Sequence, residues 1–268
     1  MNSHPRSLTV ASLNTLGLPI TGSRLAERYA AIGEVFEASE VDVANFQEVV
    51  TYYHLRQLVR SMPSYRFVSF RRSVAGPAAG LATLSRSPVS QTYYRRFPLP
   101  STADTAGLPW WTRLEATLKG SLVTRLDDHR ISIVNTHLLA NGDGDWSATS
   151  RYYRADQGQL AALGRYVGAA PQPAIVSGDF NIARDSSLYD DFIRDTGLID
   201  AFGDDCPPTF HAEYLEPGRT AHCIDFLLLS DPSITVESAE LTFTAELPMR
   251  GGTGYASDHL GLQVRVAV

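Results

Sequence analysis

The chain has 268 residues, 44% of them hydrophobic, and a formal net charge of −6. This size supports a large core in one or two domains, and no stretch approaches the roughly 18 apolar residues that a transmembrane helix requires. The acidic balance gives no global attraction to nucleic acid or anionic lipid, although a local basic patch is compatible with it. Because no linker-like stretch or charge run divides the chain, we expect one domain over residues 1–268.

The first six residues carry no apolar signal-peptide core, so a cytoplasmic location is expected. The two cysteines, Cys206 and Cys223, are too few for a disulfide framework. A zinc site formed by these cysteines with His211 and His222 is a minor alternative. Their spacing matches no common zinc pattern, and neighbouring residues 222 and 223 would point to opposite faces of a strand.

The amino-terminal part alternates between strand and helix patterns. Leu25, Tyr29, Ile32 and Phe36 recur at helical spacing and predict a helix over residues 24–39. Strands are predicted at 8–13, 41–46, 65–70, 81–84 and 89–97, and a second helix at 51–61.

The second part begins with a polar, proline-bounded loop at 98–109. Residues 114–126 and 130–137 predict a hairpin with Asp127, Asp128 and His129 at its turn. Helices are predicted at 151–167 and 186–196, and strands at 174–177, 224–229, 234–243 and 260–266. Many strands, few helices and mixed connections predict an α+β sandwich, with sheets inside and helices on the outer faces.

Short polar motifs stand at the ends of the apolar, strand-like runs. They are Ser12-Leu13-Asn14, Phe46-Gln47-Glu48, Asn135-Thr136-His137, Ser177-Gly178-Asp179-Phe180-Asn181 and Ser257-Asp258-His259, with Asp225 as a further partner. Carboxylates, carboxamides and two imidazoles that converge at strand ends favour a hard divalent cation and phosphate chemistry.

Three of these residues are candidate metal ligands. Glu48 is the best candidate for direct binding, Asn14 adds a neutral amide oxygen, and Asp258 is a second carboxylate. Magnesium prefers one or two carboxylates, with water and substrate oxygens completing its shell. The alternatives are a strand-end glutamate that faces water and an asparagine that serves only a turn.

The remaining motif residues suit proton transfer and phosphate binding. Asp225 is expected to accept the imidazole N–H of His259, which fixes the tautomer and raises the basicity of a general base. His137 is expected to bind phosphate or to protonate the leaving oxygen. If the segment stays extended, Asp179 and Asn181 point the same way, one toward an attacking water and one toward the phosphoryl oxygens. An Asx turn is the alternative for this pair.

Taken together, these motifs resemble the endonuclease/exonuclease/phosphatase superfamily of DNase I-like proteins, over residues 8–267. The resemblance implies a four-layered α/β sandwich, with two central mixed β-sheets flanked by helices, and Mg²⁺ dependence with Mn²⁺ as a substitute. By this resemblance, Asn14 and Glu48 correspond to the family's metal-site residues, and Asp179 and Asn181 to its Gly-Asp-x-Asn pair. Asp225 corresponds to the orienting aspartate, His259 to the catalytic histidine, and Asp258 to the acidic residue before it.

Further stretches resemble the neutral-sphingomyelinase-like branch: residues 14–19, Lys119-Gly120 and residues 196–202. His137 makes the chain similar to the DNase I and sphingomyelinase branches rather than to the abasic-site branch. Two positions depart from the family pattern. Cys223 stands where an arginine often precedes the Ile-Asp pair, and Leu16 stands where the abasic-site branch carries an acidic or amide residue.

The resemblance implies hydrolysis of a phosphoester on a lipid-like or small polar molecule. Trp110 and Trp111 are expected either to contact a membrane surface peripherally or to pack in the core or pocket. Trp146 is expected either to wall the substrate cleft or to pack against a helix face. Lys119 is the only lysine among 23 basic residues, which reflects either codon usage or a place where an ammonium suits better than a guanidinium.

Two other functions remain open, and the chain is expected to be a monomer. A DNase I-like nuclease would track phosphates with arginines; the candidates are Arg71, Arg72, Arg95, Arg96, Arg151 and Arg154. A non-catalytic binding protein of the same fold would have lost a catalytic side chain, and none of the matched positions is lost.

Overall fold

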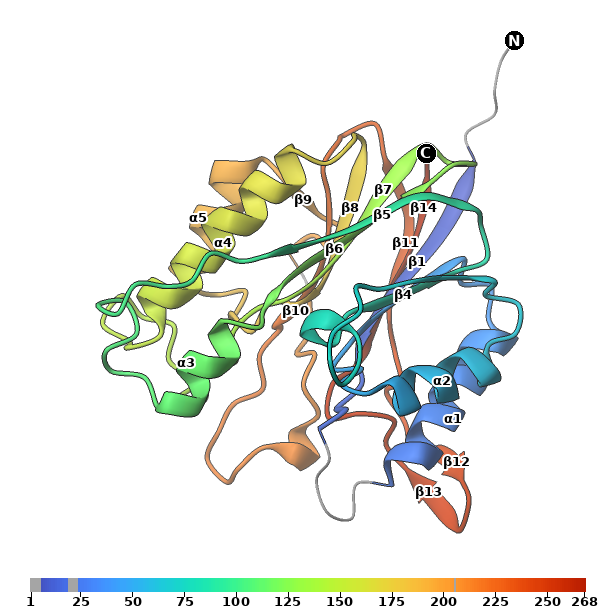
Figure 1. Cartoon of the computed structure of the whole chain (residues 1–268), viewed down its shortest axis with the longest axis horizontal. Helices are drawn as coiled ribbons and strands as arrows, with labels where there is room; N and C mark the ends of the chain where they lie inside the picture. The colour runs from blue at the N-terminus through green and yellow to red at the C-terminus, as the bar shows by residue number, and fades with distance from the viewer. Residues whose placement is uncertain (1–5, 19–23, 205) are drawn as a thin grey trace.

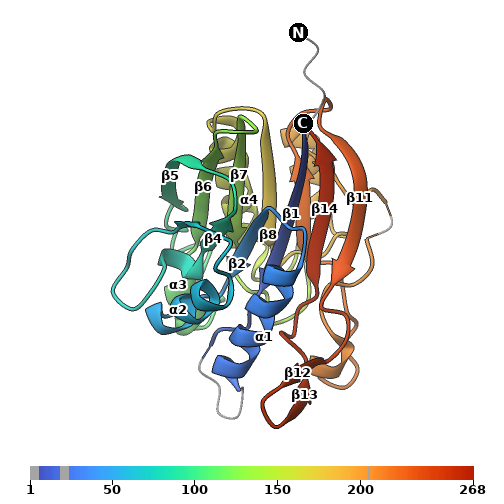
Figure 2. The same cartoon turned by 90° about the vertical axis from the view of Figure 1, so that its right-hand side faces the viewer.

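Two six-stranded β-sheets lie face to face, with helices on their outer sides (Figures 1 and 2). The structure is a computed structural model that describes residues 6–18, 24–204 and 206–268. The predicted α+β sandwich, with two mixed sheets flanked by helices, is confirmed.

The first sheet has the strand order β11-β14-β1-β2-β4-β3. Its strands are β1 (Ser7–Asn14), β2 (Val43–Gln47), β3 (Phe67–Ser69), β4 (Ala82–Ser85), β11 (Thr235–Thr242) and β14 (Gly261–Ala267). Helices α1 (Leu25–Ala38) and α2 (Tyr52–Ser61) belong to its outer side. Ile32 and Phe36 of α1 pack with Leu13 and Phe46 of the sheet, as the helical spacing of the apolar residues predicts.

The second sheet has the order β5-β6-β7-β8-β10-β9. Its strands are β5 (Val89–Arg96), β6 (Gly120–Leu126), β7 (Ile131–His137), β8 (Ala174–Asp179), β9 (Ile199–Asp200) and β10 (Asp225–Leu229). Helices α4 (Tyr153–Gly168) and α5 (Ser187–Thr196) cover this sheet, with Leu160, Leu163 and Phe192 in the same apolar cluster as Val134 and Val176. The Ser186 hydroxyl caps α5 by accepting the Tyr189 N–H.

The smaller elements differ most from the sequence prediction. The strand expected from Leu114 begins only at Gly120, the first residue here to pair with β5, and Leu114 belongs to a helix, α3 (Trp110–Ala116). Strand β9 and the hairpin of β12 (Leu247–Met249) and β13 (Gly252–Gly254) were not expected. Two 3-10 turns, η1 (Ala78–Gly80) and η2 (Ala212–Tyr214), complete the elements.

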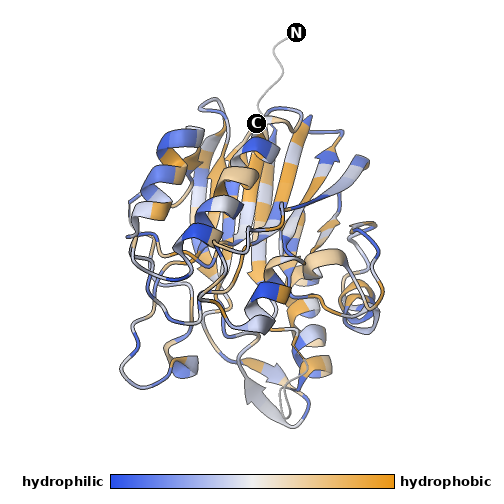
Figure 3. Ribbon diagram, turned by 60° about the vertical axis from the view of Figure 1, so that its left-hand side comes forward, coloured by the Kyte–Doolittle hydropathy of each residue, from blue (hydrophilic) through white to orange (hydrophobic). Residues whose placement is uncertain are grey.

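The space between the two sheets changes character along the strands. At one end it is filled by apolar side chains such as Val10, Ile133 and Ile175. At the other end the alternate positions become polar, as with Asn135 and Ser177, which are fully buried. The strands inside the sandwich are largely apolar, whereas polar and apolar residues alternate along the helices (Figure 3). The polar end is where the strand-end motifs meet.

The two cysteines are joined by a disulfide between Cys206 and Cys223, 17 positions apart. The zinc alternative is therefore wrong, because these sulfurs are not available as thiolate ligands. The disulfide closes the loop between β9 and β10 without making a multi-bridge framework. None of the helices in the described ranges combines the length and apolar character needed to cross a bilayer.

Candidate active site

The strand order explains why distant motifs converge. Strands β1 and β2 are parallel, as are β7 and β8, so their carboxyl ends lie at one end of the sandwich, the lower end in Figure 1. The register sets Asn14 beside Gln47, and it sets Asp179 between His137 and Asp225. Side chains alternate along a strand, so Asn14 points to the same face as Val10, which lies between the sheets.

Asn14 joins the two sheets. Its Nδ2 donates to Asp179 Oδ2 at 2.9 Å and to Glu48 Oε1 at 3.2 Å, while its Oδ1 accepts the Leu16 N–H at 3.0 Å. The side chain is 1% exposed. One carboxamide therefore fixes the relative position of two carboxylates that come from different sheets.

Glu48 presents an open carboxylate oxygen to the site. Its Oε2 is buried and has no hydrogen-bond partner within the described ranges. The backbone of Glu48 has a positive φ of 60°, and Gly17 packs so closely that an added Cβ would lie 1.7 Å from the Glu48 carbonyl oxygen. The strained backbone directs an unpaired carboxylate oxygen into the polar end of the sandwich, as expected for a ligand of a cation. Glu48 and Asn14 therefore offer oxygen ligands of the kind that Mg²⁺ prefers.

His259 is held by a hydrogen-bonded chain. Its Nδ1 lies 2.9 Å from Asp225 Oδ2, and the same oxygen accepts the Thr209 hydroxyl at 2.6 Å. Burial disfavours the charged imidazole, but the carboxylates of Asp225 and Asp179 outweigh it and raise the pKa of His259 well above its usual value. The two carboxylates therefore make this imidazole more basic than a free one, and its Nε2 lies 3.7 Å from Asp179 Oδ2.

His137 lies on the other side of Asp179. Its Nε2 is 2.9 Å from Lys119 Nζ and 3.5 Å from Asp179 Oδ2. Burial, and then the charges of Lys119 and His259, lower the pKa of His137 well below its usual value, so a neutral imidazole is favoured. Burial raises the pKa of Asp179 to about 7, although the positive neighbours oppose this shift. The buried Lys119 therefore brings the ammonium charge to this side of the site.

The Asp179–Asn181 segment is not extended as the period-two argument required. Asn181 has a φ of 53°, and its backbone N–H donates to Asp179 Oδ1 at 2.9 Å, which is the Asx-turn geometry. The Asn181 Nδ2 donates to the Leu138 carbonyl at 3.2 Å. Gly178 is required here, because an added Cβ would lie 1.9 Å from the Thr136 carbonyl oxygen. The turn still leaves Asn181 at the edge of a cavity.

That cavity, of about 560 Å³, is the cleft beside the site. Trp146 lines it and donates its indole N–H to the Asn181 carbonyl at 2.8 Å. Phe210 and Tyr214, from the loop closed by the disulfide, form another wall. Trp110 and Trp111 lie elsewhere, 68% and 59% exposed on α3, so neither packs in the core.

Asp258 is hydrogen-bonded to neither Glu48 nor Asn14 in the described part of the chain. Its Oδ1 accepts the Ser257 hydroxyl at 3.1 Å. Asp258 and Glu48 both act electrostatically on Arg28, whose guanidinium donates to backbone carbonyls of the Asn14 loop. The cluster whose ligand atoms lie within 4.8 Å of one another is instead Asp179, Asp225 and His259.

Sequence reasoning missed two residues of this site. Arg28 shares the apolar face of the first helix with Ile32, four positions on, and an arginine on such a face is a signal that could have been used. Thr209 lies in an irregular loop with no periodicity, and nothing in its neighbourhood indicates that its hydroxyl supports Asp225.

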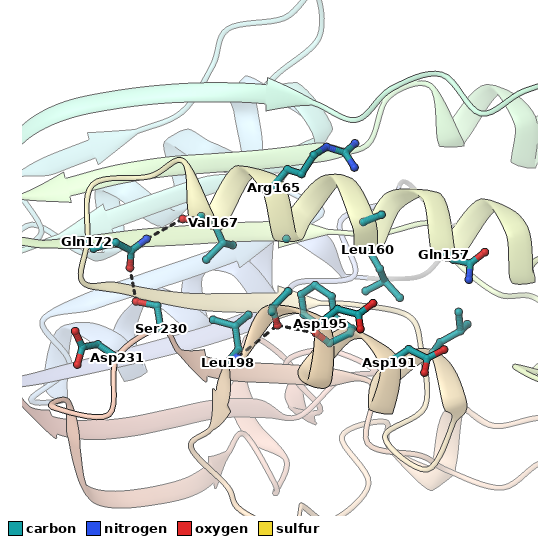
Figure 4. Close-up of a pocket in the computed structure, with 16 residues that line it drawn as sticks. Gln157, Leu160, Arg165, Val167, Gln172, Asp191, Asp195, Leu198, Ser230 and Asp231 are labelled. Carbon is teal, nitrogen blue, oxygen red and sulfur yellow. Dashed lines mark hydrogen bonds between the residues drawn. The ribbon is translucent and has the colours of Figure 1, made fainter.

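A larger cavity, of about 710 Å³, lies between α4 and α5 (Figure 4). Leu160 and Leu198 line it together with the polar side chains of Asp191, Asp195 and Arg165. None of the predicted site residues lines it, whereas Asn181 and Trp146 line the smaller cleft.

Comparison with known families agrees with this geometry. The family model of the Endonuclease/Exonuclease/phosphatase family matches residues 11–259. The chain belongs to this family. The match includes all of the strand-end motifs, from Asn14 to His259.

The relatives of this family member include a phospholipase C and a putative sphingomyelinase. The inositol phosphosphingolipids phospholipase C of Schizosaccharomyces pombe is 28% identical over 194 residues, 72% of this chain and 45% of that protein. A putative neutral sphingomyelinase of Caenorhabditis elegans is 27% identical over 189 residues, 68% of this chain and 42% of that protein. The chain thus spans less than half the length of these relatives, and the expected similarity to the sphingomyelinase-like branch is confirmed.

Among solved structures, D. rerio TDP2 complexed with a single-strand DNA product matches with a TM-score of 0.73. The two chains are 16% identical, and the match covers 98% of this chain and 99% of that one. At this identity the likeness concerns the fold, which the family shares between branches.

Proposed function

We propose that this family member is a Mg²⁺-dependent phosphodiesterase, a hydrolase of phosphoric esters. The observation that carries the proposal is the buried, unpartnered Glu48 Oε2 beside Asn14, opposite the His259–Asp225 pair. A carboxylate oxygen without a donor is costly unless a cation or water satisfies it. Glu48 and Asn14 would hold the cation, with Asp258 as the second carboxylate, and Mn²⁺ can replace Mg²⁺.

A bound cation would neutralise the negative charge of the phosphate group. The side chains of the chain do the remaining work. His259 accepts the proton of the attacking water, Asp225 holds the imidazole tautomer, and Asp179 orients the water. Lys119 and the amide of Asn181 stabilise charge on the phosphoryl oxygens. Burial and then the charge of Lys119 lower the pKa of His137 and favour its neutral form, which binds phosphate as a hydrogen-bond partner.

For the substrate we favour a phosphodiester of a lipid or a lipid-like molecule. The support is the similarity to sphingolipid phospholipases and the cleft walled by Trp146. Trp146, with its indole against Asn181, is positioned to contact a leaving or head group. The second candidate is a nuclease; D. rerio TDP2, which shares the fold, is complexed with a single-strand DNA product.

The test is hydrolysis of a substrate panel with and without EDTA: bis-nitrophenyl phosphate, sphingomyelin, lysophospholipids, inositol phosphates, DNA and RNA. Activity should vanish in EDTA and return with Mg²⁺ or Mn²⁺. Full activity of metal-stripped enzyme would overturn the metal assignment. Preference for DNA, with a steep salt dependence of binding, would favour the nuclease.

A Mg²⁺ titration of the variant Glu48→Gln separates the metal ligand from the base. The variant should need more Mg²⁺ and recover activity at high concentration, because an amide oxygen is a weaker ligand than a carboxylate. His259→Ala should not be rescued in this way. The reverse pattern would show that the two roles had been exchanged.

A further inference from the structure

Exposed apolar side chains are concentrated around one short helix. Of the eleven large hydrophobic residues exposed within the described ranges, five fall between residues 99 and 118, each more than half exposed. They are Leu99, Trp110, Trp111, Leu114 and Leu118. A grouping of this kind, unlike single exposed residues, marks an interaction site.

The spacing places three of them on one side of α3, and Leu118 lies in the turn that follows the helix. Trp110 and Leu114 are four residues apart, and with Trp111 they cover an arc of about 100° at 3.6 residues per turn. The opposite side, with Thr112 and Ala116, is buried. Thus α3 is anchored by one face and leaves the aromatic and leucine face to solvent.

The local charge differs in sign from that of the whole chain. Residues 95–119 contain four basic and two acidic residues, in a chain of net charge −6. Of the acidic pair, Glu115 is bound to Lys119 at 2.8 Å, and Asp104 accepts the Ser101 hydroxyl. The exposed Arg95 and Arg96 stand in β5 opposite Ser121 and Gly120, just after the exposed end of α3.

This face is continuous with the active site. Leu118 precedes Lys119, whose Nζ contacts both Glu115 of α3 and His137 of the site. In both views α3 lies toward the end of the molecule where the site strands terminate, opposite the described chain ends at Arg6 and Val268 (Figures 1 and 2). This face and the site therefore lie toward the same end of the molecule.

We propose that α3, with Leu99 and Leu118, docks on the surface of a phospholipid bilayer. The two indoles sit at the boundary between headgroups and acyl chains, and the flanking arginines face anionic headgroups. The proposal rests on the proposed function in one respect: docking would present lipid-embedded phosphodiesters to the cleft.

The test is flotation of the full chain with phosphatidylcholine vesicles, with and without phosphatidylserine. The variant Trp110→Ala/Trp111→Ala should bind about tenfold more weakly or worse. Each interfacial indole contributes a binding free energy that is roughly proportional to the apolar area that it buries. Arg96→Gln should weaken only the phosphatidylserine-dependent, salt-sensitive part. Tyr53→Ala, which removes an aromatic side chain of similar exposure from α2, is the matched control and should bind as the wild type does.

Turnover of soluble bis-nitrophenyl phosphate should be unchanged in the double tryptophan variant, which also shows that it folds. Wild-type protein that does not bind vesicles, or a double variant that binds equally well, would overturn the docking face. A wild-type dimer that the double variant converts to a monomer would assign the face to a second copy and overturn it too. Vesicle binding without any phosphoester turnover would sink the proposed function alone, whereas turnover without vesicle binding would sink the docking alone.

Discussion

Thr209, Asp225 and His259 form a chain of hydrogen bonds that ends at the proposed reaction centre. His259→Ala should lower kcat by about 10² to 10⁴, the usual contribution of positioned general-base catalysis. Asp225→Asn should also be severe, because an amide favours the wrong imidazole tautomer; in a serine-protease triad the corresponding change costs about 10⁴. The measurement is kcat with bis-nitrophenyl phosphate at saturating Mg²⁺.

Thr209→Val is the graded control for this prediction. It removes the hydroxyl that donates to Asp225 Oδ2 and accepts the backbone N–H groups of Ile224 and Asp225, but it leaves the imidazole contact. Its loss of kcat should therefore be smaller than that of Asp225→Asn. Circular dichroism should show that all three variants are folded. If His259→Ala keeps the wild-type kcat, another group is the base.

A second prediction at this scale concerns Asp156, a buried acid outside the site. It is 1% exposed, and neither carboxylate oxygen has a hydrogen-bond partner among the residues that the structure describes. Burial raises its pKa well above the usual value. The pKa of Asp156 is higher in the folded than in the unfolded state. Its contribution to the free energy of unfolding is therefore complete at pH values below the unfolded pKa and is lost as the pH rises through the folded pKa.

Asp156→Asn should therefore raise the free energy of unfolding at neutral pH by about 1 to 3 kcal/mol, with little gain near pH 4, since it removes the buried charge. Urea unfolding at several pH values measures this. Asp190→Asn, which removes an exposed acid of α5, is the control for the loss of a surface charge. A gain for Asp156→Asn that is equal at every pH would contradict the titration argument.

At the scale of elements, periodicity explains which strands and helices could be predicted from the sequence and which could not. In β7, residues 131, 133, 135 and 137 read Ile, Ile, Asn and His, and the same change from apolar to polar occurs in β8 at Ile175, Ser177 and Asp179. Such runs predict both a strand and a polar end. The α3 helix was missed because its buried face consists only of Thr112 and Ala116, too little to give an apolar period.

The loop between β9 and β10 is the element that local sequence describes least. It contributes Thr209 to Asp225 and Phe210 to the packing against His259, with ring centroids 5.1 Å apart. Its shape depends on the link between Cys206 and Cys223. Contacts of this kind join positions with no common periodicity, so a single sequence does not reveal them.

Removal of this disulfide should affect stability and substrate binding together. Cys206→Ala/Cys223→Ala should lower the free energy of unfolding by about 2 to 4 kcal/mol, the usual effect for a loop of this length. KM should rise as well, since the loop forms a wall of the cleft. Urea unfolding and kinetics of the wild type, with and without reductant, should give the same two changes. Reduction that alters neither quantity would contradict the tethering role.

At the scale of the whole molecule, the sandwich has an apolar and a polar end, and the site occupies the polar one. Leu8 and Val266 belong to the apolar cluster between the sheets. Toward the site, Asn45 bonds across to Ser177, and Gln47 bonds across to Asn135. The sandwich class could be predicted from strand and helix patterns, but this pairing of amides between sheets could not, because it depends on the packing of the two sheets.

Asn135 is the residue that most directly tests this view of the interior. From β7 its Nδ2 donates to the carbonyl oxygens of Phe46 at 3.1 Å and Ala82 at 3.0 Å, both in the other sheet. Its Oδ1 accepts from Gln47 Nε2 at 2.8 Å. Asn135→Ala would leave these groups buried without a partner, so it should lower the free energy of unfolding by about 2 to 4 kcal/mol. Ile133→Val, two positions earlier at the apolar end, should cost only about 0.5 to 1.5 kcal/mol. Urea unfolding of both variants decides the matter: if Asn135→Ala costs no more than Ile133→Val, water satisfies the exposed amide and carbonyls, and the polar layer does not hold the sheets together.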